Sequence, residues 1–183
     1  SALVLAAASV LGFGTAREAA EAARQKVKDD RFAEAAKLYE EAVRLAETPA
    51  ERFRIYLHES ESLRSRKRYG EALIPARKAL AMNHANLTAI KAVYHVYYGH
   101  CVREGVKFLE DCIARKDEYK LSDQDLIELW NTHGFGSFLC FDPDRIAKAL
   151  KEIKKLGGKA TGLTEIKAEH ALTVSEVLKV TGS

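Results

Sequence analysis

One pattern of mostly small residues occurs three times in this chain, at positions i, i+4 and i+7. The copies are Ala35, Tyr39 and Ala42; Ala72, Ala76 and Ala79; and Gly105, Leu109 and Cys112. They begin 37 and 33 residues apart. Residues four and seven positions apart share one face of an α-helix, so each copy predicts a helix face that packs closely on a neighbour. A recurrence of about 34 residues built from helices indicates a helical repeat array.

Helix signals divide the chain into four hairpins. Apolar residues at helical spacing predict helices over residues 18–28, 31–45, 51–66, 69–82, 86–99 and 102–115. A fourth, more degenerate hairpin is indicated by the capping-box pattern of Ser122 and Asp125 and by the helix start at Asp142 and Pro143. We therefore expect an all-α fold, an antiparallel helix-hairpin solenoid with repeats at about 16–48, 49–85, 86–118 and 122–157. A capping helix over residues 163–179 would close it, and residues 17–183 would form one domain.

The chain resembles the tetratricopeptide repeat (TPR) family over roughly residues 16–156. The family pattern opens with Trp-x-x-Leu-Gly-x-x-Tyr, continues with Ala-x-x-x-Phe and closes with Pro. The matching residues are Trp130 and Gly134 for the opening, and Phe32, Ala35 and Tyr39 for the middle. The aromatic residue is replaced at Ala76 and Leu109, and the closing proline is missing. The resemblance implies a right-handed superhelix of helix pairs, a fold that usually binds proteins or peptides.

In such solenoids the first helix of each hairpin lines the concave surface, and the stripe opposite its packing face forms a groove. The predicted partner-binding residues of this groove are Arg24, Arg54, His58, Arg64, Lys91, Tyr94 and Tyr98. Tyrosine and arginine are enriched among the residues that dominate binding energy. The alternative for Tyr94 and Tyr98 is a place in the core beneath residues 116–120, where their hydroxyls would need partners.

Charge and motifs argue against several other classes of function. The net charge of +3, from 29 basic and 26 acidic residues, is too small for a nucleic-acid-binding surface. The sequence contains no phosphate-binding loop, dinucleotide fingerprint or nucleophile elbow. His95 and His100 do not have same-face metal spacing, and His133 with Cys140 has no third ligand. We therefore expect no enzyme activity, no cofactor and no metal site.

The segment at residues 1–16 is apolar on every side and gives way to charge at Arg17. It resembles the apolar region of a secretory signal peptide, with Gly14, Thr15 and Ala16 as a small-residue cleavage site. At about 15 residues it is too short for a stable membrane span. This predicts an exported or periplasmic protein. The alternative is an Ala-rich helix packed on the first repeat of a cytoplasmic protein.

Two hypotheses of function follow from these patterns. The first is an interaction module whose basic, tyrosine-containing groove holds a protein or peptide that is acidic or bears aromatic residues. The second is a structural unit that forms homo-oligomers through the N-terminal apolar arm or through the last helix. Sedimentation separates the two, because a monomer at every concentration favours the interaction module.

Overall fold

The computed structural model describes residues 12–161, and every regular element in this range is an α-helix. Eight helices are described, packed as adjacent pairs that are consistent with a helical repeat. The chain divides into two compact units, one ending at Asn83 and the other beginning at His84. The predicted capping helix at 163–179 and most of the predicted N-terminal segment at 1–16 lie outside the described residues.

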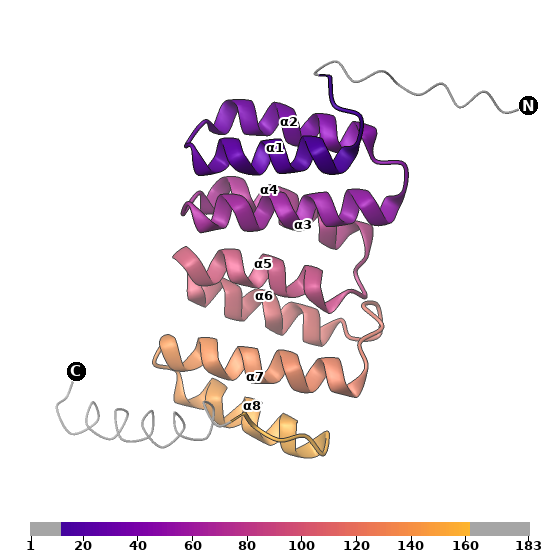
Figure 1. Cartoon of the computed structure of the whole chain (residues 1–183). Coiled ribbons are helices and arrows are strands. Elements are labelled where there is room, and N and C mark those ends of the chain that lie inside the picture. The colour runs from indigo at the N-terminus through magenta and orange to yellow at the C-terminus, as the bar shows by residue number, and fades with distance from the viewer. Residues whose placement is uncertain (1–11, 162–183) are drawn as a thin grey trace, which may run out of the picture. The chain divides into compact units, whose positions relative to one another are not determined.

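The first unit consists of two helix pairs. α1 (Ala16–Lys28) packs against α2 (Phe32–Leu45), and α3 (Pro49–Ser65) packs against α4 (Tyr69–Met82). α3 also contacts α1 and α2, which joins the two pairs into one body. Figure 1 shows each pair as a hairpin whose helices run in opposite directions. The bounds of α4 coincide with the predicted range, and those of the other three helices lie close to theirs.

Capping boxes open the first helix of each pair in this unit. The hydroxyl of Thr15 accepts a hydrogen bond from the Glu18 amide at 3.2 Å, and that of Thr48 accepts one from the Glu51 amide at 3.1 Å. In return, the carboxylates of Glu18 and Glu51 accept the backbone amides of these two threonines. Pro49 follows in the first helical turn, where its missing N–H removes no helical bond. These local signals determine where α1 and α3 begin, and so which of their side chains face each other.

The two hairpin turns of the first unit share one backbone conformation, 37 residues apart. Asp30 and Lys67 each adopt a left-handed backbone with φ of 59°. The amide that follows each of them bonds back to the carbonyl five residues earlier, at 2.8 Å in the first turn and 3.0 Å in the second. This arrangement is the Schellman motif that ends many α-helices. Its recurrence shows that the sequence repeat is also a repeat of backbone geometry.

The predicted small-residue faces lie in the core of the first unit. Five of the residues, each at most 1% exposed, are Ala35, Ala42, Ala72, Ala76 and Ala79. Their small side chains let the helices pack closely at interior density. Tyr39 is 2% exposed, and its hydroxyl donates to Ser62 Oγ at 3.0 Å, which satisfies the polar end of this buried ring.

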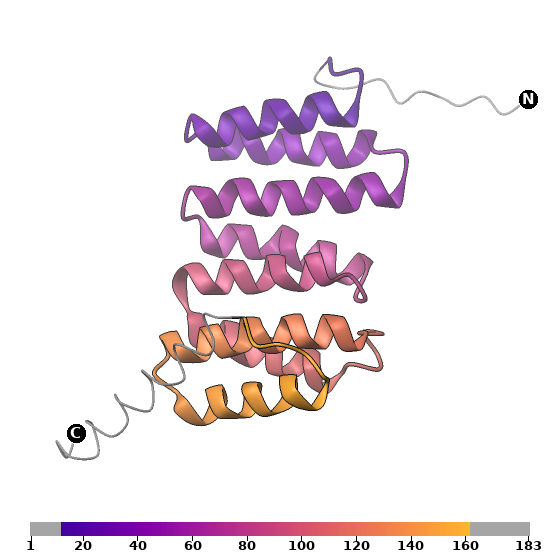
Figure 2. The same ribbon diagram turned by 60° about the horizontal axis from the view of Figure 1, so that its bottom comes forward.

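The second unit also consists of two helix pairs. α5 (Leu87–His100) packs against α6 (Val102–Ala114), and α7 (Asp123–Leu139) packs against α8 (Pro143–Lys155). Contacts between α6 and α7 join the pairs, and Figure 2 shows α7 and α8 side by side. The predicted starts of α7 and α8 are confirmed, because the caps at their first residues form as the sequence predicts.

Two glycines of the second unit make room for the ring of Tyr94. A Cβ atom at Gly105 in α6 would lie 3.0 Å from the Cβ of Tyr97 and 3.2 Å from the Tyr94 ring. A Cβ atom at Gly136 in α7 would lie 2.9 Å from the Tyr94 hydroxyl and 2.8 Å from Val106 Cγ2. Gly105 is therefore a site of close helix approach, as the sequence predicts. Tyr94 is 2% exposed and belongs to the core of this unit.

Candidate functional site

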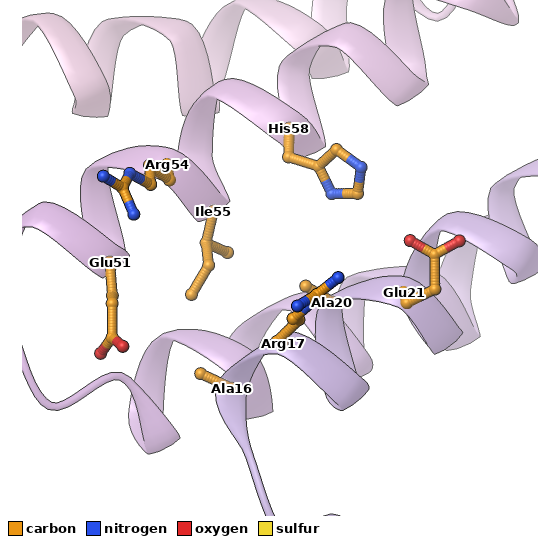
Figure 3. A pocket seen from close by; sticks show the side chains of 8 residues that line it. All are labelled: Ala16, Arg17, Ala20, Glu21, Glu51, Arg54, Ile55 and His58. Carbon is orange, nitrogen blue, oxygen red and sulfur yellow. The ribbon is translucent and has the colours of Figure 1, made fainter.

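A groove lies between α1 and α3 of the first unit, and one end of it forms a pocket of about 350 Å³. The pocket is lined by Ala16, Arg17, Ala20 and Glu21 of α1 and by Glu51, Arg54, Ile55 and His58 of α3. In Figure 3 the side chains of Ile55 and His58 point from α3 toward α1. Alanine and isoleucine give the pocket an aliphatic floor, and charged side chains surround it. We call it the Ile55 pocket.

A second pocket, of about 310 Å³, continues the groove toward the C-terminal ends of the same two helices. It is lined by Arg24, Val27 and Lys28 of α1 and by His58, Glu61, Ser62 and Ser65 of α3. We call it the Lys28 pocket. His58 lines both pockets and so lies where they meet. The two pockets together, referred to as the α1–α3 groove, offer an aliphatic compartment followed by a polar one.

Helical spacing explains why these residues meet in one groove. On α1, the lining side chains Arg17, Ala20, Arg24 and Lys28 are three or four residues apart and so form one stripe. On α3, Glu51, Ile55, His58, Glu61 and Ser65 form the facing stripe by the same rule. Ala19 and Ala23 of α1 are both 0% exposed, so α1 presents small side chains to the core of the first unit.

The acidic side chains of the groove are more fully engaged than the basic ones. Glu21 lies 3.8 Å from Arg24, and the Glu51 carboxylate accepts the amide of Glu47 at 2.8 Å as part of the helix cap. Within residues 12–161, no ion pair involves Arg17, Lys28 or Arg54. The groove therefore presents basic groups that are available to a ligand.

His58 occupies the centre of the groove as a half-buried, uncharged group. Burial lowers its pKa below the ordinary value of 6.5, and the positive charge of Arg24 lowers it further, while Glu21 and Glu61 oppose the shift. Its ring meets that of Tyr39 edge-on at a centroid distance of 6.2 Å. At neutral pH the imidazole is neutral, so it offers a ligand one hydrogen-bond donor and one acceptor.

Three of the seven predicted binding residues come together in the α1–α3 groove. Arg24, Arg54 and His58 line it, whereas Arg64 lies further along α3 and lines neither pocket. Ile55 is a lining residue that the prediction omitted. It is 6% exposed, and its place three residues before His58 on the same stripe is the sequence signal that could have identified it.

The other three predicted binding residues lie on α5 in the second unit. Lys91 is not free, because its Nζ lies 2.5 Å from Glu128 Oε1 on α7. Tyr94 lies in the core of the second unit and not on a groove surface, since the glycines of α6 and α7 admit its ring and 2% of the residue is exposed. Tyr98 is 41% exposed and stacks on Phe135 at a centroid distance of 5.9 Å. None of these three residues lines the Ile55 pocket or the Lys28 pocket.

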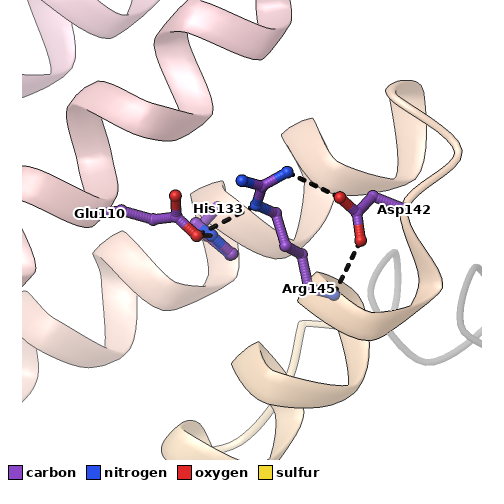
Figure 4. Close-up of polar contacts among 4 residues, drawn as sticks. All are labelled: Glu110, His133, Asp142 and Arg145. Atoms are coloured by element: carbon purple, nitrogen blue, oxygen red, sulfur yellow. Dashed lines mark hydrogen bonds and ion pairs between the residues drawn. The ribbon is translucent and has the colours of Figure 1, made fainter.

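A second polar cluster, in the other unit, has a structural character (Figure 4). Glu110 Oε1 lies 3.2 Å from His133 Nε2 and accepts from Arg145 Nε at 3.1 Å. Arg145 Nη1 donates in turn to Asp142 Oδ2 at 2.7 Å. Burial alone would raise the pKa of Glu110, but the hydrogen bonds from Arg145 and His133 lower it below 4.5. The cluster thereby ties α6, α7 and α8 together.

His133 of this cluster is of a residue type that can act as a general base, but its burial closes it to a substrate. His133 and Ser137 stand four residues apart on α7, and both are 0% exposed. Their Nδ1 and Oγ atoms have no hydrogen-bond partner among the described residues. A catalytic base must reach the proton that it removes from a substrate. The α1–α3 groove is therefore the better candidate for function.

Two further observations concern metal ions and membranes. Within residues 12–161, His, Cys, Asp and Glu side chains do not gather in groups of three or more that could ligate a metal ion. Among the helices described, none has both the length and the apolar character that a membrane span requires.

Comparisons with protein-family models, curated proteins and solved structures find no match for this chain. Function is therefore inferred from the groove and its chemistry.

Proposed function

We propose that the chain is a TPR-like interaction module that binds a protein or peptide partner in the α1–α3 groove. The observation that carries this proposal is the meeting of two pockets at His58, between the first helices of successive hairpins. Their cavity volumes of about 350 and 310 Å³ are each in the lower part of the range of ligand sites. A long groove with two compartments suits an extended chain better than one compact small molecule.

The repeat geometry supports the TPR-like part of the proposal. The left-handed hairpin turns recur 37 residues apart, and small residues fill the close contacts between paired helices. In such arrays each hairpin packs on its neighbours and the first helices form a continuous binding surface. A groove between α1 and α3, the first helices of two successive hairpins, supports a ligand site of this kind.

Selection from a random peptide library displayed on phage tests the proposal. The full chain is the target, and the double variant Arg54→Glu with His58→Glu is used for counter-selection. The matched control is Lys37→Glu with Lys154→Glu, which changes two exposed side chains on α2 and α8 that do not line the groove. We expect peptides that bind the wild type and the control but lose binding to the groove variant. Peptides that bind all three proteins equally would contradict the proposal.

A further inference from the structure

We infer that the natural occupant of the α1–α3 groove is an internal acidic segment of a partner protein. An aliphatic side chain of this segment fills the Ile55 pocket, and carboxylates two and four residues away from it along the chain lie over the Lys28 pocket. The inference rests on the proposed function and adds the chemical class of the partner. It is carried by the different linings of the two pockets and by the balance of engaged and free charges.

The lining of the Ile55 pocket suits an apolar side chain of the partner as an anchor. Ile55 is 6% exposed and Ala20 is 8% exposed, so both form its floor, and neither can donate or accept a side-chain hydrogen bond. An aliphatic group that enters is removed from water on contact with this floor, which is the main source of affinity for such anchors. A charged anchor would lose hydration there without finding a buried partner on the floor.

The charges around the groove favour carboxylates in the partner. The cationic side chains are Arg17, Arg24, Lys28 and Arg54, and the acidic ones are Glu21, Glu51 and Glu61. The cap of α3 engages Glu51, and Arg24 neighbours Glu21. The cap holds the Glu51 carboxylate in place but leaves its negative charge, so in the described part of the chain Arg17, Lys28 and Arg54 face two carboxylates, and the groove has a small excess of positive charge. Complementary charge both speeds encounter and excludes basic segments.

Helix geometry sets the spacing that the partner must have. Eight residues of α1 separate Ala20 in the first pocket from Lys28 in the second, a rise of about 12 Å. An extended peptide rises about 3.3 Å per residue and places residues i, i+2 and i+4 on one face. A leucine at i with carboxylates at i+2 and i+4 therefore spans the groove.

Fluorescence anisotropy with a defined probe tests the inference. The probe is fluorescein-Gly-Ser-Leu-Ser-Asp-Ser-Glu-Gly-amide, and a second probe carries the same residues in reverse order, so that both chain directions are sampled. One analogue replaces Asp and Glu by Asn and Gln, and another replaces Leu by Ser. We expect at least one direction to bind, and each analogue of it to bind at least about tenfold more weakly. Added salt should weaken the probe more than its neutral analogue.

Matched protein variants locate the bound probe. Arg24→Glu with Lys28→Glu reverses two exposed charges of the Lys28 pocket and should weaken binding at least about tenfold. Lys37→Glu with Lys154→Glu makes the same change in net charge outside the groove and should leave affinity within about twofold. A probe that ends in a free carboxylate should bind as well as the amide, because the inference concerns an internal segment.

The possible results separate this inference from the proposed function. Equal binding of the probe and its neutral analogue would overturn the acidic class of partner, and so would a strong preference for the free C-terminal carboxylate. Groove-dependent peptides from the phage selection that carry no acidic residues would also overturn it, while the proposed function would stand. If neither the probes nor any selected peptide depends on the groove residues, both the inference and the proposed function are wrong.

Discussion

Arg66 and Asp30 join the two hairpin turns of the first unit. Arg66 Nη2 donates to both carboxylate oxygens of Asp30, at 2.7 and 2.6 Å, and Nε donates to Oδ1 at 3.0 Å. Two residues later, the Arg68 guanidinium lies 4.6 Å from the centre of the Phe32 ring. The second turn therefore stacks on the first through an ion pair and a cation–π contact. Contacts between successive hairpins are what stabilise a helical repeat, because one hairpin alone cannot bury its faces.

The pairing of Arg66 with Asp30 predicts a salt-dependent coupling between the turns. Arg66→Gln and Asp30→Asn should each lower the stability of the first unit, and the double variant should lose less than the sum. The coupling should shrink as ionic strength rises to about 1 M, because both side chains are exposed and screened. Urea unfolding followed by far-ultraviolet circular dichroism measures it. Strictly additive effects at low salt would show that the pair contributes nothing.

The left-handed turn at Lys67 predicts that glycine stabilises the first unit. A side chain at φ of 59° brings its Cβ close to the following carbonyl, and glycine relieves this. Lys67→Gly should raise the free energy of unfolding by about 0.5–1 kcal/mol, after part of the gain is offset by the flexibility of glycine in the unfolded chain. Lys37→Gly is the matched control. It lies inside α2, so it should lower stability by about 1 kcal/mol. The same sign for both variants would contradict the prediction.

Local signals explain how much of the fold could be predicted from the sequence. A helix start is determined by a few adjacent residues, so Thr48 with Pro49, and Asp142 with Pro143, could be recognised directly. The hairpin turns were harder to recognise, because Asp30 and Lys67 occupy positions where glycine is the usual signal.

The candidate site could be predicted only where helical periodicity was sufficient. Arg24 and His58, each of which follows from the stripe of its own helix, do line the same pocket. Tyr94 and Tyr98 share one stripe of α5, four residues apart, yet they are 2% and 41% exposed. What separates them is the space beside Gly105, on the next helix, and beside Gly136, on α7, which lies much further along the chain. The partner of Lys91, Glu128 on α7, depends on such long-range packing too.

Gly136 predicts a large effect of one added methyl group. Alanine there would place its Cβ 2.8 Å from Val106 Cγ2 and 2.9 Å from the Tyr94 hydroxyl, and Val106 is 1% exposed and cannot move aside freely. Gly136→Ala should lower the free energy of unfolding of the second unit by about 1–3 kcal/mol despite the better helix propensity of alanine. The fluorescence of Trp130, the single tryptophan of the chain, reports unfolding of this unit. Gly70→Ala in the first unit is the control, followed by far-ultraviolet circular dichroism, and it should raise stability by up to about 1 kcal/mol because the space beside Gly70 is open. Equal effects of the two variants would contradict the packing around Gly136.

The buried hydroxyl of Tyr94 predicts a substitution that does not destabilise. This hydroxyl has no hydrogen-bond partner among the described residues, and burial raises its pKa, which keeps it protonated. Tyr94→Phe should leave the free energy of unfolding unchanged or raise it by up to about 1 kcal/mol. Tyr39→Phe is the matched control and should cost about 1 kcal/mol, because the Tyr39 hydroxyl donates to Ser62. A loss above about 1 kcal/mol for Tyr94→Phe would reveal a hydrogen bond to this hydroxyl.

Glu59 predicts a pH dependence of the first unit that glutamine removes. Burial raises the pKa of Glu59 from 4.5 to about 7; Lys78 opposes the shift and Glu40 adds to it. Between these two pH values the folded state binds more protons than the unfolded chain, so the contribution of Glu59 to stability falls as pH rises from 4.5 to about 7. Glu59→Gln keeps the shape of the glutamate side chain and removes its charge. It should raise the free energy of unfolding by about 1–2 kcal/mol above pH 7, relative to its effect near pH 4.5.

His58 acts in the opposite direction, since its lowered pKa costs stability as pH falls below 6.5. Because His58 is present in both proteins, the difference between variant and wild type isolates Glu59. Urea unfolding at pH 5 and pH 8 measures that difference, and a difference that is equal at the two pH values would contradict the burial of this carboxyl group. Glu59→Met, neutral and of similar length, should reproduce the pH dependence of the difference.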